Sequence, residues 1–120
     1  GVEQEAQSQP YRSLERLSIA IQNSTENPEA VERMQKYLRQ QNFRNVYTIE
    51  DTNQFLDKTE IIAQQGDLRA ARSLQKLLGF GQVEASSTGD LGSDLTIRIG
   101  SDAEKWIENN SFSRSDSGNP

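Results

Sequence analysis

Hydrophobic residues in this chain fall into short runs with two different periods. In some runs, large apolar side chains alternate with small or polar ones, which is the period-two pattern of a strand with one buried face. The clearest run is LTIRI near the C-terminus, and the weakest is QVEAS. Strands are predicted over residues 17–23, 45–50, 59–64, 82–86 and 95–99.

Two further runs have the spacing of amphipathic helices. Residues 28–41 bring Val31, Met34 and Leu38 to one face, and residues 67–78 do the same with an alanine and several leucines. Apolar side chains at this spacing are the core-facing side of a helix rather than a cofactor site. The spacing therefore predicts two helices that pack on the predicted strands.

Polar and glycine residues mark the ends of both predicted helices. Asn27 and Asp67 can each supply an N-cap side chain, and Pro28 suits a first helical position. Asn42 and Gly79 stand where the two helices should end, because both residue types tolerate the left-handed conformation that follows many helices.

The order of these elements predicts the fold class. A strand, a helix and a strand are followed by the same series and one more strand, so each half resembles a split βαβ unit. We expect an α+β two-layer sandwich, with a mixed sheet of about five strands and two main helices on one face. The other face is expected to meet solvent or a ligand. A capping box from Ser101 to Glu104 predicts a short last helix carrying Trp106.

The two ends of the chain differ in composition from its centre. Both are rich in polar residues with too little apolar area to offset the entropy of ordering. Residues 1–13 are expected to be a flexible linker, with Gly1 a cloning remnant, and residues 108–120 a flexible tail. The folded domain is expected over residues 14–107.

Charge and hydropathy exclude two classes of partner for this fragment. Its 120 residues carry a net charge of −5, with basic residues scattered among acids, which repels nucleic acid. No stretch approaches the roughly 20 apolar residues that span a bilayer, so the fragment itself is not expected in the membrane. We expect a monomer.

The chain has no histidine and no cysteine, which removes the usual general base and the strongest nucleophile. The neighbouring acids Glu50 and Asp51 are interpreted as a solvated turn rather than a catalytic pair. The acidic stretch from Asp90 to Asp94 lacks the alternating ligands of a calcium loop. We predict no catalytic residues, no metal and no cofactor.

Several segments between Leu17 and Asp102 occur in an order that one family shares. They are the turn Asn23, Ser24, Thr25 after the first strand, Leu38 and Phe43 at the first helix end, residues 59–62 (TEII), Ala70, Ala71 and Leu74, residues 77–79 (LLG), and residues 94–102 (DLTIRIGSD). In these segments the chain resembles the LytR C-terminal domain, which is the C-terminal domain of LytR-CpsA-Psr (LCP) family cell-envelope proteins. Ser24 and Asn42 stand where members usually have glycine.

The resemblance implies a place and a context. A parent protein of this family is anchored in the cytoplasmic membrane, and a separate catalytic domain transfers lipid-linked glycopolymers to peptidoglycan. This chain would then be a non-catalytic extracytoplasmic accessory domain that assists or regulates envelope assembly. Its partners would be that catalytic domain, peptidoglycan or the glycopolymer. A fainter likeness to SPOR domains offers an alternative, a peptidoglycan-binding or glycan-binding module that uses the open sheet face.

Two surfaces are candidate sites. On the open sheet face, amide, hydroxyl, guanidinium and aromatic groups suit a sugar or muropeptide, although a plain hydrated surface also fits. These residues are Ser18, Gln22, Tyr47, Thr96 and Arg98. At the strand ends, free N–H groups beside a helix start suit an anion, unless the side chains there only fix turns. These residues are Asn23, Ser24, Thr25, Gly100 and Asp102.

Overall fold

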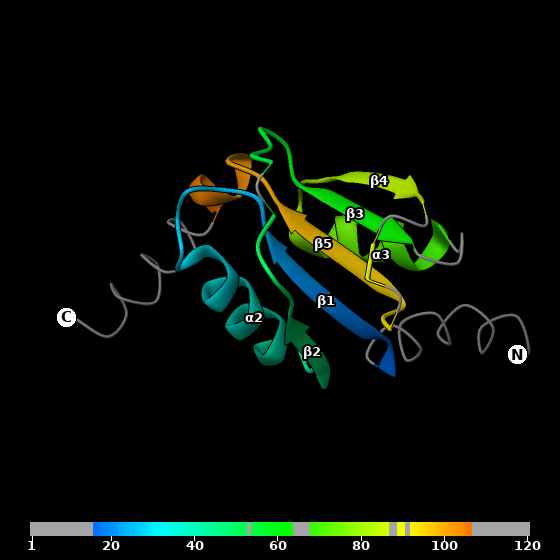
Figure 1. The fold of residues 1–120 in the computed structure, drawn as a ribbon. Helices are drawn as coiled ribbons and strands as arrows, with labels where there is room; N and C mark the ends of the chain where they lie inside the picture. The colour runs from blue at the N-terminus through cyan, green and yellow to red at the C-terminus, as the bar shows by residue number, and fades with distance from the viewer. Residues whose placement is uncertain (1–15, 53, 64–67, 87–88, 91, 107–120) are drawn as a thin grey trace, which may run out of the picture.

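The computed structural model describes residues 16–52, 54–63, 68–86, 89–90 and 92–106 (Figure 1). The strands are β1 (Ser18–Asn23), β2 (Asn45–Thr48), β3 (Glu60–Ala63), β4 (Gln82–Ala85) and β5 (Leu95–Ile99). The main helices are α2 (Ala30–Gln40) and α3 (Leu68–Leu78). The predicted linker 1–13, the predicted tail 108–120 and the predicted cap Asp67 lie outside the described residues.

The five strands form one mixed sheet in the order β2-β1-β5-β3-β4. β1 and β2 are parallel neighbours joined through α2, and β3 and β4 are parallel neighbours joined through α3. β5 lies between these two units, parallel to β1 and antiparallel to β3. The predicted α+β fold with a five-stranded mixed sheet is therefore confirmed. The expectation of split units was wrong, because β5 lies between the units and not inside either one.

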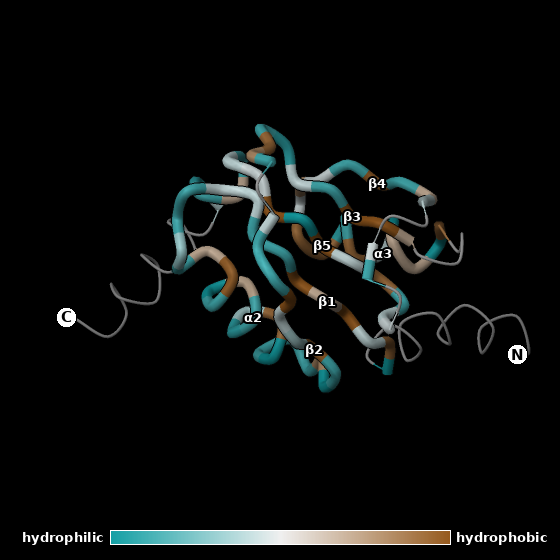
Figure 2. Tube along the Cα trace, in the orientation of Figure 1, coloured by the Kyte–Doolittle hydropathy of each residue, from teal (hydrophilic) through white to brown (hydrophobic). Residues whose placement is uncertain are grey.

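Both helices pack on one face of the sheet and share a single core. In β1 and β5, alternate residues such as Ile19, Ile21 and Ile97 are fully buried in that core, as the period-two pattern predicts. Val31, Met34 and Leu38 of α2 meet them, and Figure 2 shows apolar colour along the central strands and polar colour over much of α2. From α3, the core contains Ala71, Leu74 and Leu78.

The helix ends follow the sequence with one shift. Asn42 has a φ of 75° and Gly79 has a φ of 86°, so the predicted left-handed residues after both helices are confirmed. α2 begins at Ala30 rather than at residue 28, because the side-chain oxygen of Asn27 accepts the Glu29 N–H at 3.0 Å in a turn before the helix. β2 ends at Thr48, two residues before the end of the predicted strand.

A short helical segment over residues 102–106 closes the described chain and carries Trp106. The Trp106 ring lies edge-on to the Tyr37 ring of α2, with centroids 4.7 Å apart. It also lies 5.5 Å from the Phe80 ring, which follows α3. The indole therefore links both helices on the covered face of the sheet.

We expect Trp106→Ala to lower the free energy of unfolding by about 2 kcal/mol, because a partly buried indole and two aromatic contacts are lost. Urea denaturation measures the change. The matched control is Lys105→Ala, whose exposed side chain should change stability by less than about 0.5 kcal/mol. Equal stability of the two variants would show that the indole does not hold the helices together.

Candidate functional site

The sheet face opposite the helices is covered at one end by the chain itself. Ala20, Ile62 and Thr96 are neighbours on this face and are fully buried. The Asp90 N–H donates to Thr96 Oγ1 at 2.9 Å, and Ser93 Oγ lies 3.2 Å from the same atom. The expectation of an open face is therefore corrected at this end, where Asp90, Ser93 and Asp94 of the connection before β5 lie over the amino ends of β1 and β5.

Tyr47 and Ser18 hold this covering connection in place. The Tyr47 hydroxyl donates to Asp90 Oδ2 at 2.5 Å, and burial, reinforced by that contact, raises the pKa of Tyr47. Ser18 donates from its N–H and its hydroxyl to Asp94 Oδ2, at 3.0 and 3.1 Å. Ser18, Tyr47 and Thr96 thus all bond to their own chain. Thr96 is also fully buried, whereas a ligand contact at the half-buried Ser18 and Tyr47 stays a prediction.

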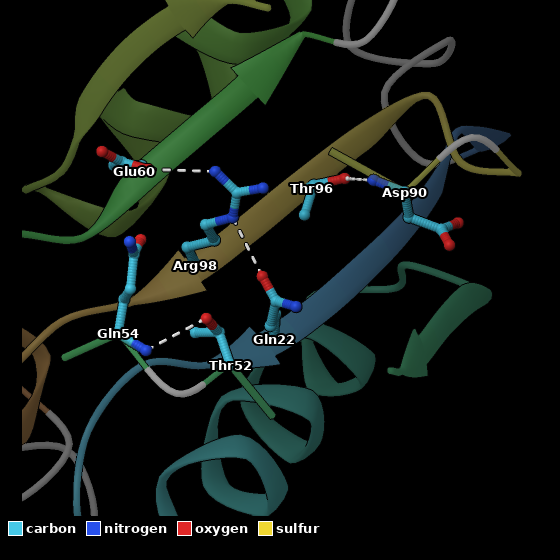
Figure 3. A network of polar contacts seen from close by, with 7 residues as sticks. All are labelled: Gln22, Thr52, Gln54, Glu60, Asp90, Thr96 and Arg98. Atoms are coloured by element: carbon cyan, nitrogen blue, oxygen red, sulfur yellow. Dashed lines mark hydrogen bonds and ion pairs between the residues drawn. The ribbon is translucent and has the colours of Figure 1, made fainter. Parts of the chain in front are cut away.

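Gln22 and Arg98 lie at the uncovered end, near the carboxyl ends of β1 and β5. Arg98 Nε donates to Gln22 Oε1 at 2.9 Å (Figure 3). Gln22 Nε2 donates to the Glu50 carbonyl at 3.0 Å. Arg98 Nη1 lies 3.5 Å from Glu60 Oε1 on β3. Three adjacent strands therefore contribute one polar network, of which the sequence predicted Gln22 and Arg98.

A groove of about 350 Å³ lies over this network. The groove is also lined by residues of the connection after β2. The backbone of this connection is bonded to the end of β1, because the Thr52 N–H donates to the Asn23 carbonyl and the Leu56 N–H donates to the Ser24 carbonyl. The complete lining is Gln22, Ser24, Thr52, Gln54, Leu56, Glu60 and Arg98. Thr52, Gln54 and Leu56 were not predicted from the sequence, because a polar connection has no periodicity to reveal its position. Glu60 had a usable signal, its outward place in a period-two strand.

At the predicted turn site, the side chains of Asn23 and Asp102 make hydrogen bonds to nearby residues. Asn23 Oδ1 accepts the Thr25 N–H at 3.0 Å and the Thr25 hydroxyl at 2.7 Å, while Asn23 Nδ2 donates to the Asn27 carbonyl at 2.8 Å. Asp102 Oδ1 accepts the Thr59 N–H at 2.9 Å and the Thr59 hydroxyl at 2.7 Å. The side chains of Asn23 and Asp102 are thus engaged within their turns, as in the turn-fixing interpretation, while an anion at this place stays a prediction.

Gly100 and Ser24 complete this region with different roles. The Gly100 N–H donates to Thr59 Oγ1 at 2.9 Å and is therefore also occupied. The Ser24 backbone is bonded to Ile99 and Leu56, but its buried hydroxyl has no hydrogen-bond partner within the described residues. Of the five residues of the predicted turn site, only Ser24 lines the groove.

Glu60 and Glu84 form a carboxyl pair on the uncovered part of the sheet. Burial, then the charge of Glu60 and a hydrogen bond to its carboxylate, raise the pKa of Glu84 above 4.5. The two residues lie on adjacent parallel strands, where Glu84 pairs in register with Ile62 and Glu60 stands two residues before Ile62 on the same face.

The raised pKa of Glu84 predicts a pH-dependent stability. Below pH 4.5 the group is protonated in the folded and unfolded states, so burial costs nothing there. As pH rises through the higher pKa of the folded state, ionisation becomes costly only in the fold, and the free energy of unfolding falls. Glu84→Gln should therefore gain stability at pH 7, by less than about 1 kcal/mol, and show no gain at pH 4. Urea denaturation at both values, with exposed Glu32→Gln as control, checks this; an equal gain at both pH values would contradict it.

The described residues contain no group of three or more acids, histidines or cysteines placed to hold a metal ion. Within the same residues, no helix combines the length and the apolar character needed to cross a membrane.

Comparison with known proteins shows which family this chain belongs to. A family model described as "LytR cell envelope-related transcriptional attenuator" matches residues 16–102, which includes every described strand and both main helices. No curated protein and no solved structure gives a significant match. The residues on which the sequence resemblance rested, between Leu17 and Asp102, all lie within the matched range. The chain therefore belongs to the LytR C-terminal domain family of LytR-CpsA-Psr cell-envelope proteins.

Proposed function

We propose that this chain is a non-catalytic accessory domain of a membrane-anchored LytR-CpsA-Psr protein. In this proposal it acts as a monomer on the extracytoplasmic side of the cytoplasmic membrane. There it assists or regulates the transfer of glycopolymers to the cell wall by a separate catalytic domain of the same protein. The observation that carries the proposal is the family match over residues 16–102.

The chemistry of the chain supports binding rather than reaction. The sequence has no histidine or cysteine. The acids best placed to act are engaged: Glu60 pairs with Arg98, Asp102 fixes Thr59, and Asp90 accepts from Tyr47. General acid–base catalysis needs a group within reach of a substrate proton and with a suitable pKa. These acids instead stabilise turns and strands.

A second candidate function is direct glycan binding, and the groove at the end of β1, β5 and β3 favours it. The groove offers amide, hydroxyl, guanidinium and carboxylate groups held by a rigid sheet. Small-molecule sites commonly combine such a preformed cavity with a few fixed polar groups. In the SPOR-like alternative, this groove replaces the whole sheet face as the binding surface.

The accessory role is tested in the full-length protein by removing residues 16–106. We expect glycopolymer transfer to the cell wall to fall or to lose its regulation, while membrane insertion and the fold of the catalytic domain are unchanged. The control replaces the same residues with a flexible linker of equal length, so that spacing is preserved. Unchanged transfer, localisation and partner binding in both variants would contradict the proposal.

A further inference from the structure

We propose that the groove binds an uncharged sugar ring of a glycan chain. This inference rests on the second candidate function above and specifies its ligand class. The floor of the groove is preorganised, because Gln22 is bonded to both Arg98 and the Glu50 carbonyl, and Arg98 also reaches Glu60. A fixed floor lowers the entropic cost of binding a small polar ligand.

The wall of the groove supplies hydrogen-bonding groups with spare capacity. The connection after β2 is held against the end of β1 by backbone bonds from Ile49, Thr52 and Leu56, which fix the course of its backbone. Thr52 Oγ1 accepts the Gln54 N–H at 3.2 Å, which leaves the Thr52 hydroxyl hydrogen to donate elsewhere (Figure 3). The Gln54 side chain makes no bond among the described residues and offers both a donor and an acceptor.

Ser24 gives an independent sign that a ligand belongs here. Its hydroxyl is buried and without a partner in the described part of the chain, although its backbone groups are both bonded. An unsatisfied buried polar atom is rare in folded proteins and calls for a specific explanation. Ser24 lies at the base of the groove with no exposed surface, so a ligand hydroxyl or amide satisfies it only when the lining side chains above it move aside.

Charge distinguishes a neutral ligand from an anion. The groove lining contains one cation, Arg98, and one anion, Glu60, which lie 3.5 Å apart. Glu84 beside them brings a second carboxyl group with a raised pKa. A phosphate or carboxylate ligand would have to compete with Glu60 for Arg98 and would lie near both acids, whereas sugar hydroxyls and amides pay no such cost.

Phe55 supplies an apolar contact beside these polar groups. It stands between two lining residues, Gln54 and Leu56, and its side chain is 62% exposed. Phe55 is not itself part of the groove lining, and the proposal places its ring at the rim of the groove. A pyranose ring has an apolar face of C–H groups that can stack on such a ring while its hydroxyls enter the groove.

Isothermal titration calorimetry of the 120-residue chain with chitotetraose tests the inference, with maltotetraose and sodium phosphate as comparison ligands. We expect saccharide binding with a dissociation constant on the order of 0.1–1 mM and no heat with phosphate. Stronger binding of chitotetraose than of maltotetraose would assign the site to acetamido sugars, and equal binding to sugar hydroxyls; both support the inference. Binding of phosphate alone, or of nothing, would overturn it.

Three variants locate the site. Phe55→Ala should weaken saccharide binding roughly five- to tenfold. Leu77→Ala, at an exposed leucine on α3, should leave binding unchanged. Ser24→Ala should weaken binding without loss of stability, because it removes a hydroxyl that has no partner in the fold. Equal affinities of all three variants and the unaltered chain would overturn the assignment to this groove.

The failure of this inference can be distinguished from the failure of the proposed function. If the chain does not bind sugar but deletion of the domain still impairs glycopolymer transfer, only this inference is refuted. If the chain binds sugar but its deletion leaves transfer unimpaired, only the accessory role is refuted.

Discussion

Gly100→Ala should lower the free energy of unfolding by about 3 kcal/mol or more, the largest loss among the substitutions considered. A Cβ at Gly100 would lie 2.6 Å from the Lys58 carbonyl carbon, 2.8 Å from its oxygen and 2.8 Å from the Thr59 nitrogen. These are backbone atoms that cannot rotate away. The chain after β5 also donates from Ser101 and Asp102 to the carbonyls of residues 56 and 57, so separation of the two segments would break several bonds at once.

The matched control is Gly92→Ala in the connection before β5. There the nearest atoms to an added Cβ are Asp90 Oδ2 at 3.4 Å and the Tyr47 hydroxyl at 3.7 Å, which are ordinary contacts. Thermal and urea denaturation should show Gly92→Ala within about 0.5 kcal/mol of the unaltered protein. If the two glycine variants lose the same stability, the close crossing at Gly100 is not a constraint on the fold.

Asn23→Ala should lower the free energy of unfolding by about 2–3 kcal/mol. Asn23 is buried, and its side chain makes three hydrogen bonds, two with Thr25 and one with the Asn27 carbonyl. Truncation leaves the buried Thr25 N–H without its partner where β1 turns towards α2. It also removes one bond to the Asn27 carbonyl, which keeps those from Ala30 and Thr25. Because Ser24 follows directly, the variant should also disturb the adjacent groove.

Asn45→Ala is the control for Asn23, since this exposed asparagine makes a single side-chain bond, at 3.3 Å to the Arg16 carbonyl. Urea denaturation should give it a loss of less than about 0.5 kcal/mol. If Asn23→Ala loses no more stability than Asn45→Ala, the side-chain hydrogen bonds of Asn23 do not stabilise this turn.

Local features of the fold could be predicted from the sequence because local physics determines them. Ile19, Ile21 and Ile97 lie on the buried face by strand alternation, and Asn42 and Gly79 take the left-handed conformation that the helix ends require. These features depend on the residues within a turn or two. No long-range information was needed to place them.

Features that depend on distant contacts could not be predicted. Asp90 meets Tyr47 across 43 residues of sequence, and no periodicity indicates that the polar connection before β5 folds back over the sheet. Thr96 has the same outward place in its strand as Arg98, yet only Arg98 is left uncovered enough to line the groove. The sequence therefore predicted which face of the sheet lacks helices, but not which end of that face stays open.

The position of the site is the central structural claim, and NMR measures it most directly. In a ¹⁵N-labelled sample titrated with chitotetraose, we predict shifts of the side-chain amides of Gln22 and Gln54 and of the Arg98 Nε–H. The backbone amides of Asp90 and Thr96, at the covered end of the same face, should not move. Shifts confined to the covered end, with none at Gln54 or Arg98, would contradict the account.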